Sequence, residues 1–313
     1  MEKKLGMATR DAYGKVLVEL GKTNPNVVVL DADLSKSTKT ADFGKAFPDR
    51  FFNVGIMEAN MVGVAAGLAA CGKIPFISSF AAFLICKGFD QFRMAVAFSE
   101  MNVKVVGSHG GISIGEDGAS QMSIEDIALT TTLPGFSVMI PADEFSARAL
   151  VEQSAVHKGP VFIRTGRPKA PLIYNAQSQF KIGKGVRVRE GKDISIVANG
   201  LLVYEALQAA EVLKAQGIEA SVIDMHTVKP LDEEMLVAES KKTGHVVVAE
   251  EHQIWGGLGS AVATLLSSKA PCRMEFVAIQ DTYAESGEPD ALFEKYGLSS
   301  SHIVKAAKKA LGK

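Results

Sequence analysis

The feature that most constrains this chain is a regular alternation of short β-branched runs with segments in which apolar residues recur at helical spacing. Runs such as NVVVL at 26–30 are typical of buried strands, and a helical pattern separates each from the next. This alternation predicts a mostly parallel, doubly wound α/β sheet. In the first half, the predicted strands span 26–30, 74–78, 103–108, 136–140 and 161–164, and the predicted helices span 8–20, 58–71, 81–98, 123–131 and 144–157.

The alternation resumes after a break, which indicates a second, smaller α/β domain. Segment 168–184 between the two parts has no clear period and holds three lysines and two prolines, as expected of a linker. We therefore predict a first domain at 1–168, a linker at 169–184 and a second domain at 185–313, each domain a mostly parallel doubly wound sheet with helices on both faces. The second domain has predicted strands at 194–198, 220–224, 246–249 and 274–279 and predicted helices at 203–216, 232–243, 259–267 and 301–310.

Charge and apolar patterning exclude several classes of protein. The 34 basic and 35 acidic side chains nearly balance, so charge gives no indication of a nucleic-acid partner. No apolar run reaches the roughly 18 residues of a membrane span and the start is not a signal-peptide core, so we predict a cytoplasmic protein without a membrane partner. Without CxxC spacing, we expect Cys71, Cys86 and Cys272 to be buried thiols, and we predict no metal ligands in this chain.

One carboxylate, Glu58, is the only charged residue in the run 51–70, FFNVGIMEANMVGVAAGLAA. Burying an isolated carboxylate is costly, so this group must be paired with a cation or kept protonated. The run alone therefore leaves two interpretations open, a catalytic carboxyl group with a raised pKa and a charge-paired structural residue.

The segment GSHGGISIGEDGAS, residues 107–120, follows a predicted strand and contains five glycines. Such a loop adopts unusual backbone angles or approaches a ligand closely. It lacks the GxGxxG and GxxxxGK[ST] patterns, which disfavours a nucleotide-binding dehydrogenase. His109, Glu116 and Asp117 in this loop could bind hydroxyls or move protons, and solvated charges on an exposed loop are the alternative.

Two further motifs each allow two interpretations. Phe80 and Phe83 lie three residues apart at the start of a predicted helix. They could be core aromatics on one helical face, or they could form a stacking platform for a planar ring. Arg164 and Arg167 follow the last predicted strand of the first domain, where they could bind a phosphate or carboxylate or form salt bridges between domains.

The segment HVVVAEEHQIWGGLGSAV, residues 245–262, places two acids and a histidine after a buried strand. Glu250, Glu251 and His252 could form a site, and an interface loop anchored by Trp255 fits the pattern equally well.

Taken in order, seven motifs resemble the C-terminal two thirds of transketolase, the thiamine-diphosphate-dependent enzyme. They are ATRDAYGKVL, DADLSKS, GIMEANM, SSFAAF, SHGGISIGEDG, GPVFIRTGRP and AEEHQIWGGLG, and they run over essentially the whole chain. The resemblance implies a pyrimidine-binding domain followed by a transketolase C-terminal domain, as in one subunit of a split transketolase.

The resemblance also implies the site residues. Glu58 would hydrogen-bond N1′ of the cofactor's aminopyrimidine, a role that suits a carboxyl group whose pKa is raised by apolar surroundings. Glu58 and His109 are thus the predicted catalytic residues, and the bound cofactor would act as an electron sink for a two-carbon ketol unit. The other implied contacts are Phe83 stacking on the pyrimidine, Phe80 lining its pocket and Asp33 close to the cofactor, with Arg10, Ser37 and Arg167 holding the sugar phosphate and His109 and Asp117 binding substrate hydroxyls.

Two positions depart from the pattern of the family. Gln121 stands where a histidine often follows the GEDG loop, and Cys86 stands where a tyrosine commonly follows the phenylalanine pair. Both departures bear on the choice of donor and acceptor sugars rather than on use of the cofactor.

One family motif is absent from the chain. Transketolases hold the cofactor diphosphate through Mg²⁺ with a GDG motif and a later asparagine, and the sequence contains no GDG. The resemblance therefore implies a separate N-terminal subunit that supplies the diphosphate and Mg²⁺ site, in an α2β2 assembly. It also implies that two copies of this chain associate with each other in the core of that assembly. The implied substrates are sugar phosphates, such as those of the pentose phosphate pathway.

Other assignments remain open at this point. A 1-deoxy-D-xylulose-5-phosphate synthase-like enzyme would use the same glutamate, and the Asp90–Gln91 pair resembles that group, but it usually has arginine at the position of Phe83. The β subunit of a 2-oxoacid dehydrogenase E1 component matches the length but typically lacks the SHGGISIGEDG loop. A non-catalytic regulatory α/β subunit is the alternative from a different class.

Overall fold

The first sheet is built from the β-branched runs of the first half of the chain. The computed structural model, which describes residues 3–313, orders its seven strands as β12-β6-β7-β5-β4-β2-β3. The strands from β2 to β7 are all parallel, as the alternation predicts. Their bounds are β2 (Val27–Asp31), β3 (Phe51–Asn53), β4 (Ile74–Phe80), β5 (Lys104–Ser108), β6 (Ser137–Met139) and β7 (Val161–Arg164).

Alternate side chains of this sheet belong to two different cores, because successive residues of a strand face opposite sides. Val27 and Val29 pack in one core with α1, α3 and α7, whereas Val28 and Leu30 pack in another with α4, α5 and α6. The sheet is therefore doubly wound, with helices on both faces. The helices are α1 (Thr9–Thr23), α2 (Ser35–Thr38), α3 (Ala41–Ala46), α4 (Glu58–Ala70), α5 (Ala81–Gln91), α6 (Asp126–Thr131) and α7 (Glu144–Val156).

The second sheet has the strand order β14-β13-β10-β11-β9, and only the edge strand β9 is antiparallel. Helices α8 and α12 pack on one face, and α9 and α10 pack on the other. The strands are β9 (Val186–Arg189), β10 (Ile194–Ala198), β11 (Ala220–Asp224), β13 (His245–Gln253) and β14 (Arg273–Ile279), and the helices are α8 (Leu202–Lys214), α9 (Glu233–Thr243), α10 (Leu258–Lys269), α11 (Pro289–Lys295) and α12 (Ser300–Ala310).

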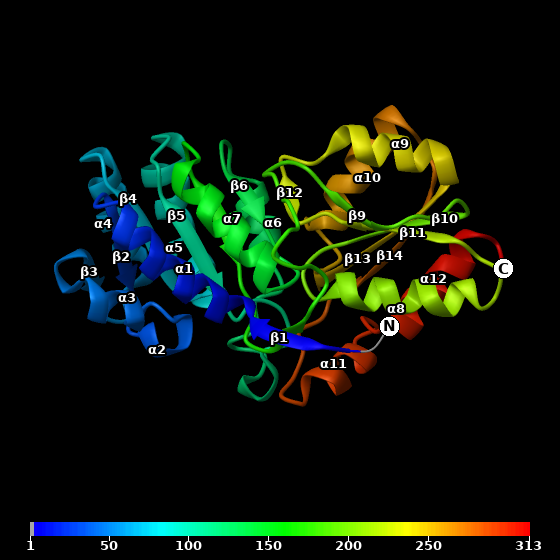
Figure 1. Cartoon of the computed structure of the whole chain (residues 1–313), viewed down its shortest axis with the longest axis horizontal. Helices are drawn as coiled ribbons and strands as arrows, with labels where there is room; N and C mark the ends of the chain where they lie inside the picture. Colours follow the sequence, from blue (N-terminus) through cyan, green and yellow to red (C-terminus); the bar gives the residue numbers. More distant parts are fainter. Residues whose placement is uncertain (1–2) are drawn as a thin grey trace.

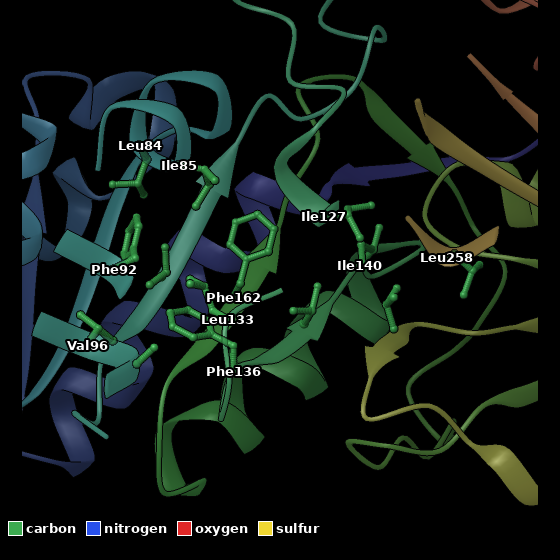
Figure 2. Packing of buried hydrophobic residues seen from close by; sticks show 14 of the residues in the cluster. Leu84, Ile85, Phe92, Val96, Ile127, Leu133, Phe136, Ile140, Phe162 and Leu258 are labelled. Atoms are coloured by element: carbon green, nitrogen blue, oxygen red, sulfur yellow. The ribbon is translucent and has the colours of Figure 1, made fainter. Parts of the chain in front are cut away.

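The two domains share backbone pairing and a core. Strand β12 (Thr227–Lys229) belongs to the second half of the sequence but pairs antiparallel with β6 of the first sheet. Strand β1 (Leu5–Ala8) runs from the side of the second domain toward α1 and pairs with β8 (Lys169–Pro171), inside the predicted linker (Figure 1). One buried cluster extends from Phe92 and Phe162 of the first domain to Leu258 of the second (Figure 2).

Two details differ from the sequence-based expectations. The helix predicted over 81–98 widens into a π-helix at Phe92–Phe98, after α5 ends. The expectation of buried thiols is wrong, because Cys71 follows the last residue of α4 and Cys86 lies on the outer side of α5, so both are exposed, and Cys272 is half-buried. Over residues 3–313, the structure has no helix that is both long and apolar enough to cross a membrane.

Candidate cofactor and substrate site

Glu58 is the first residue of α4, and only 3% of its side chain is exposed. The N-terminal end of a helix favours a carboxylate electrostatically, which suits this position. Lys87 of α5 reaches the carboxylate from the surface, with its Nζ 3.4 Å from Oε1 and 3.5 Å from Oε2. The charge-paired state that the sequence left open is thus the one this structure shows, and the catalytic role of Glu58 stays a prediction.

The rings of Phe83, Phe80 and His109 form a stack beside the Glu58–Lys87 ion pair. Phe83 and Phe80 stack with centroids 5.6 Å apart and planes 17° apart, and Phe80 stacks on the His109 imidazole at 3.9 Å and 25°. Lys87 lies at the Phe83 end of this stack, with its Nζ 4.7 Å from the centroid of the Phe83 ring. Phe80 is buried and Phe83 half-buried, so the pair contributes to the core and also presents a ring surface at the site.

His109 has a left-handed backbone, with φ +59°, and its side chain is enclosed by polar partners. Nη1 of Arg10 donates to Nε2 at 2.8 Å, and Ser108 Oγ lies 2.5 Å from Nδ1. Because an arginine can only donate, Nε2 accepts and Nδ1 carries the proton. Burial, with the positive charges of Arg10 and Arg167, lowers the pKa of His109 to about 3, so the imidazole is neutral at pH 7. Sequence reasoning did not single out Ser108.

Two arginines lie at the far end of this line. Nη1 of Arg10 also donates to the Ser37 carbonyl at 3.1 Å. Burial lowers the pKa of Arg10 and the charge of Arg167 lowers it further, so the two guanidinium groups are close enough to repel. Arg167 is held by Glu116 at 2.8 Å and by Asp117 at 3.6 Å. An anion bound between the arginines would relieve their repulsion.

The remaining predicted positions lie outside this line of contacts. Asp33 follows β2 with φ +65° and exchanges hydrogen bonds with Asn53, so it is tied to the end of β3 rather than to Glu58 or Arg10. Gln121 is half-buried. Cys86 donates to Glu125 at 3.4 Å.

Arg164 is buried and engaged by groups of the protein itself. It is 5% exposed and reaches Asp126 at 3.3 Å, the carbonyl of Glu251 at 2.8 Å and the carbonyl of Ser123 at 3.0 Å. The glycine loop passes directly over this side chain, since a Cβ on Gly110 would lie 2.1 Å from Nε of Arg164. The salt bridge of Arg164 thus lies within the first domain rather than between the domains, and its contact with the second domain is the hydrogen bond to the Glu251 carbonyl.

The acids and histidine of β13 are likewise structural. Glu250 accepts from the first amides of α10, at Leu258 and Gly259, and burial raises its pKa to about 7. His252 accepts from the amide of Ala128 in the first domain. The interface interpretation of this segment is confirmed, but its anchoring by Trp255 is wrong, because that side chain is 66% exposed.

The residues around Glu58 fit the pyrimidine half of thiamine diphosphate. A buried carboxylate can share a proton with a ring nitrogen, and the Phe83 ring beside it can stack on a heterocycle. An ammonium group sits between these two features, so the pair already accommodates a charged nitrogen. Within residues 3–313, no three His, Cys, Asp or Glu side chains are grouped to hold a metal ion.

Comparisons with known proteins identify a family domain in each half of the chain. The transketolase pyrimidine-binding domain matches residues 6–171, and the transketolase C-terminal domain matches residues 183–303. The predicted boundaries at 168 and 185 stay a prediction.

Two relatives have nearly the same length as this chain. A transketolase C-terminal section of Methanocaldococcus jannaschii is 44% identical over 95% of this chain and 94% of its own. A 6-deoxy-6-sulfo-D-fructose transketolase subunit of a Clostridium species is also 44% identical, over 95% and 92%. Human transketolase is 39% identical over 96% of this chain, which spans only 49% of the human protein.

Solved structures give the same result. A split-gene transketolase, in an inactive β4 tetramer, is 50% identical and superposes with a TM-score of 0.92 over 98% of this chain and 99% of that one. Transketolase of Campylobacter jejuni is 23% identical with a TM-score of 0.81 over 98% of this chain and 47% of its own, and shows the shared fold. The chain therefore belongs to the transketolase family, in which it corresponds to the C-terminal section.

Proposed function

We propose that this chain is the C-terminal subunit of a split transketolase that moves a two-carbon ketol unit from a ketose phosphate to an aldose phosphate. The observation that carries the proposal is the continuous line from Glu58 and Phe83 through Phe80 and His109 to Arg10. It joins a carboxylate and ring surface suited to a pyrimidine with an arginine pair suited to a phosphate. The relatives are transketolases, so the synthase, dehydrogenase and regulatory alternatives are not favoured.

Thiamine diphosphate, when bound, supplies the electron sink that stabilises the two-carbon unit. In this scheme Glu58 holds a proton at the pyrimidine N1′, and Phe83 orients the ring by stacking on it. Neutral His109 would offer Nε2 to a sugar hydroxyl once Arg10, which donates to that nitrogen in the free chain, turns to the anionic end of the sugar. Arg10 and Arg167 fix the anionic end of the sugar, and Asp117 and Ser37 lie close enough to contribute polar contacts.

The arginine pair suits two anionic end groups on the sugar. Arginine forks bind a phosphate and a sulfonate through the same oxygen geometry. One relative is named for a sulfonated sugar, 6-deoxy-6-sulfo-D-fructose. We therefore infer a ketose with a terminal phosphate or sulfonate, and a panel with both end groups on one sugar backbone separates the two.

We further propose that an N-terminal subunit supplies the diphosphate and Mg²⁺ site, in a cytoplasmic α2β2 assembly. Two findings support the need for a partner. The chain spans about half of human transketolase, and the split-gene structure made of β chains alone is described as inactive.

The test is ketol transfer by this chain with and without an N-terminal transketolase subunit, in thiamine diphosphate and Mg²⁺. We expect activity only in the mixture, and Glu58→Gln lowers it by roughly 10²- to 10⁴-fold while the variant keeps its fold. Asp90→Asn is the matched control, since Asp90 is an exposed acid of α5 that pairs with Arg93. Activity of the chain alone, or an unaffected Glu58→Gln variant, contradicts the proposal.

A further inference from the structure

Lys87 occupies the place that the proposed function gives to a pyrimidine ring. Its Nζ lies 3.4 and 3.5 Å from the two oxygens of Glu58 and 4.7 Å from the centroid of Phe83. These are the carboxylate and the ring surface that a bound pyrimidine would use. A single ammonium group cannot share both features with a stacked heterocycle, so ring and ammonium exclude each other.

The two members of the ion pair differ in exposure. The Glu58 side chain is 3% exposed and that of Lys87 is 52% exposed. Glu58 is therefore fixed within the protein, whereas Lys87 extends over it on a flexible four-carbon stem. A lysine of this kind moves into solvent at little cost, while the carboxylate it leaves must find another partner.

The position of Lys87 on α5 explains the contact. Lys87 comes four residues after Phe83, one helical turn further along the same face, so its stem runs past the Phe83 ring. From there the ammonium reaches across to the first turn of α4, which packs against α5. Both helices belong to this chain, so the contact needs no partner subunit.

We propose that Lys87 is a displaceable counterion that closes the pyrimidine-binding half of the site until an aminopyrimidine ring replaces it. The proposal rests on the proposed function, because it takes Glu58 and Phe83 as the groups that receive the ring. Binding exchanges one partner of Glu58 for another, the ammonium for the protonated ring nitrogen. The free chain thereby keeps a buried carboxylate paired, at the expense of affinity for the cofactor.

The first experiment measures the pair itself. Unfolding of the free chain in urea is compared for wild type, Lys87→Met, Glu58→Gln and the double variant. We expect the two substitutions to be coupled, because Lys87→Met leaves a buried carboxylate unpaired and Glu58→Gln removes that penalty. Additive effects would mean that the two side chains do not interact, which overturns the proposal.

The second experiment measures affinity by calorimetry, with thiamine diphosphate and Mg²⁺ added to the reconstituted complex. We expect Lys87→Met to lower Kd by about 5- to 20-fold, the effect of removing one cation–π contact and one ion pair that compete with the ring. Lys87→Arg keeps the competing charge and should retain the wild-type Kd. Lys45→Met, which breaks an exposed pair with Asp42, is the control.

The outcomes separate this inference from the proposed function. A Kd unchanged or raised by Lys87→Met, in a complex that binds thiamine diphosphate, overturns the counterion role alone. Failure of both wild-type and Lys87→Met complexes to bind thiamine diphosphate overturns the proposed function and this inference with it.

A third experiment isolates the ring from the diphosphate. When 4-amino-5-hydroxymethyl-2-methylpyrimidine is titrated into the free chain, the Glu58 and Phe83 NMR signals should shift more strongly in Lys87→Met than in wild type.

Discussion

At the scale of single residues, the neutral state of His109 has a direct consequence for stability. Burial lowers the pKa of this histidine to about 3 in the folded chain, against about 6.5 when unfolded. The contribution of a neutral buried histidine is therefore complete above pH 6.5 and is lost as the pH falls from 6.5 toward 3. We expect His109→Gln to flatten the decline in unfolding free energy between pH 6.5 and 5, by up to about 1 kcal/mol per pH unit.

NMR titration of the His109 ring protons checks the same point directly. Their shifts should stay constant from pH 8 to pH 5. A midpoint near 6.5 would show that the imidazole is more accessible to water than its contacts with Arg10 and Ser108 allow.

Arg167 gives a second prediction at this scale, with two substitutions that act in opposite directions. Glu116 lies 2.8 Å from Arg167 and competes with any substrate anion for it. We expect Arg167→Met to raise KM for the ketose phosphate about 10-fold or more, and Glu116→Gln to lower it by about 2-fold, because exposed ion pairs are weak. Steady-state kinetics of the reconstituted complex test this, with Glu285→Gln as the control at another exposed pair. Equal effects on a neutral sugar would show that the end group is not what Arg167 binds.

At the scale of secondary structure elements, Asp143 connects α7 to the segment between the domains. Its Oδ1 accepts from the Phe145 and Ser146 amides at the start of α7. Its Oδ2 accepts from the Ile173 and Tyr174 amides of the predicted linker. The linker is therefore held against the first domain by a helix-capping residue.

Asp143→Ala removes the cap and leaves the linker amides without their acceptor. We expect a loss of about 2–4 kcal/mol in unfolding free energy, the sum of one helix cap and the unsatisfied amides. Urea denaturation measures it, and Asp290→Ala in the first turn of α11 serves as the control because that acid is 91% exposed. A loss as small as that of the control would show that the linker amides find other acceptors.

The elements that sequence predicted, and those it missed, differ in length and in the range of their pairing. Strands such as β10 and β11 are continuous buried runs, and their predicted bounds agree with the structure. Strand β12 has three residues, too few for a period, and its partner β6 lies far away in the sequence. Strands β1 and β8 pair across most of the first domain, which no local pattern records.

The site was predictable to a similar extent. The carboxylate, the phenylalanine pair and the arginines could be carried over from motifs, and the structure brings Glu58, Phe83, Phe80, His109, Arg10 and Ser37 into one line of contacts. The contact between Lys87 and Glu58 could not be predicted from the sequence, because a lysine on an exposed helix face is normally solvated. This contact depends on the packing of α5 against α4, which only the structure shows.

At the scale of the whole molecule, the two domains are expected to behave as one folding unit. Strand β12 completes the edge of the first sheet beside β6, and Lys229 of that strand donates to the carbonyls of Thr131 and Leu133 in the first domain. The buried cluster that crosses from Phe162 to Leu258 adds apolar contacts to these bonds (Figure 2). Far-UV circular dichroism, which reports both domains, and Trp255 fluorescence, which reports the second, should therefore give coincident urea transitions.

Arg164 of the first domain donates to the Glu251 carbonyl of the second, so its substitution tests how far this contact couples the domains. Asp126 is fully buried, its pKa is raised by burial, and the Arg164 charge acts against that rise at a distance of 3.3 Å. Arg164→Met should cost about 3–5 kcal/mol, because it leaves the Asp126 carboxyl buried without its cation and two carbonyls without their donor. Adding Asp126→Leu should recover part of this loss, since the second substitution removes the uncompensated carboxyl group.

Arg148→Met is the matched control for this test, because Arg148 is half-exposed and pairs with Glu19 and Glu152 within the first domain. If the interface joins the domains, Arg164→Met separates the circular dichroism and Trp255 transitions while Arg148→Met leaves them coincident; coincident transitions in both variants would assign the cooperativity to β12 and the shared apolar core instead.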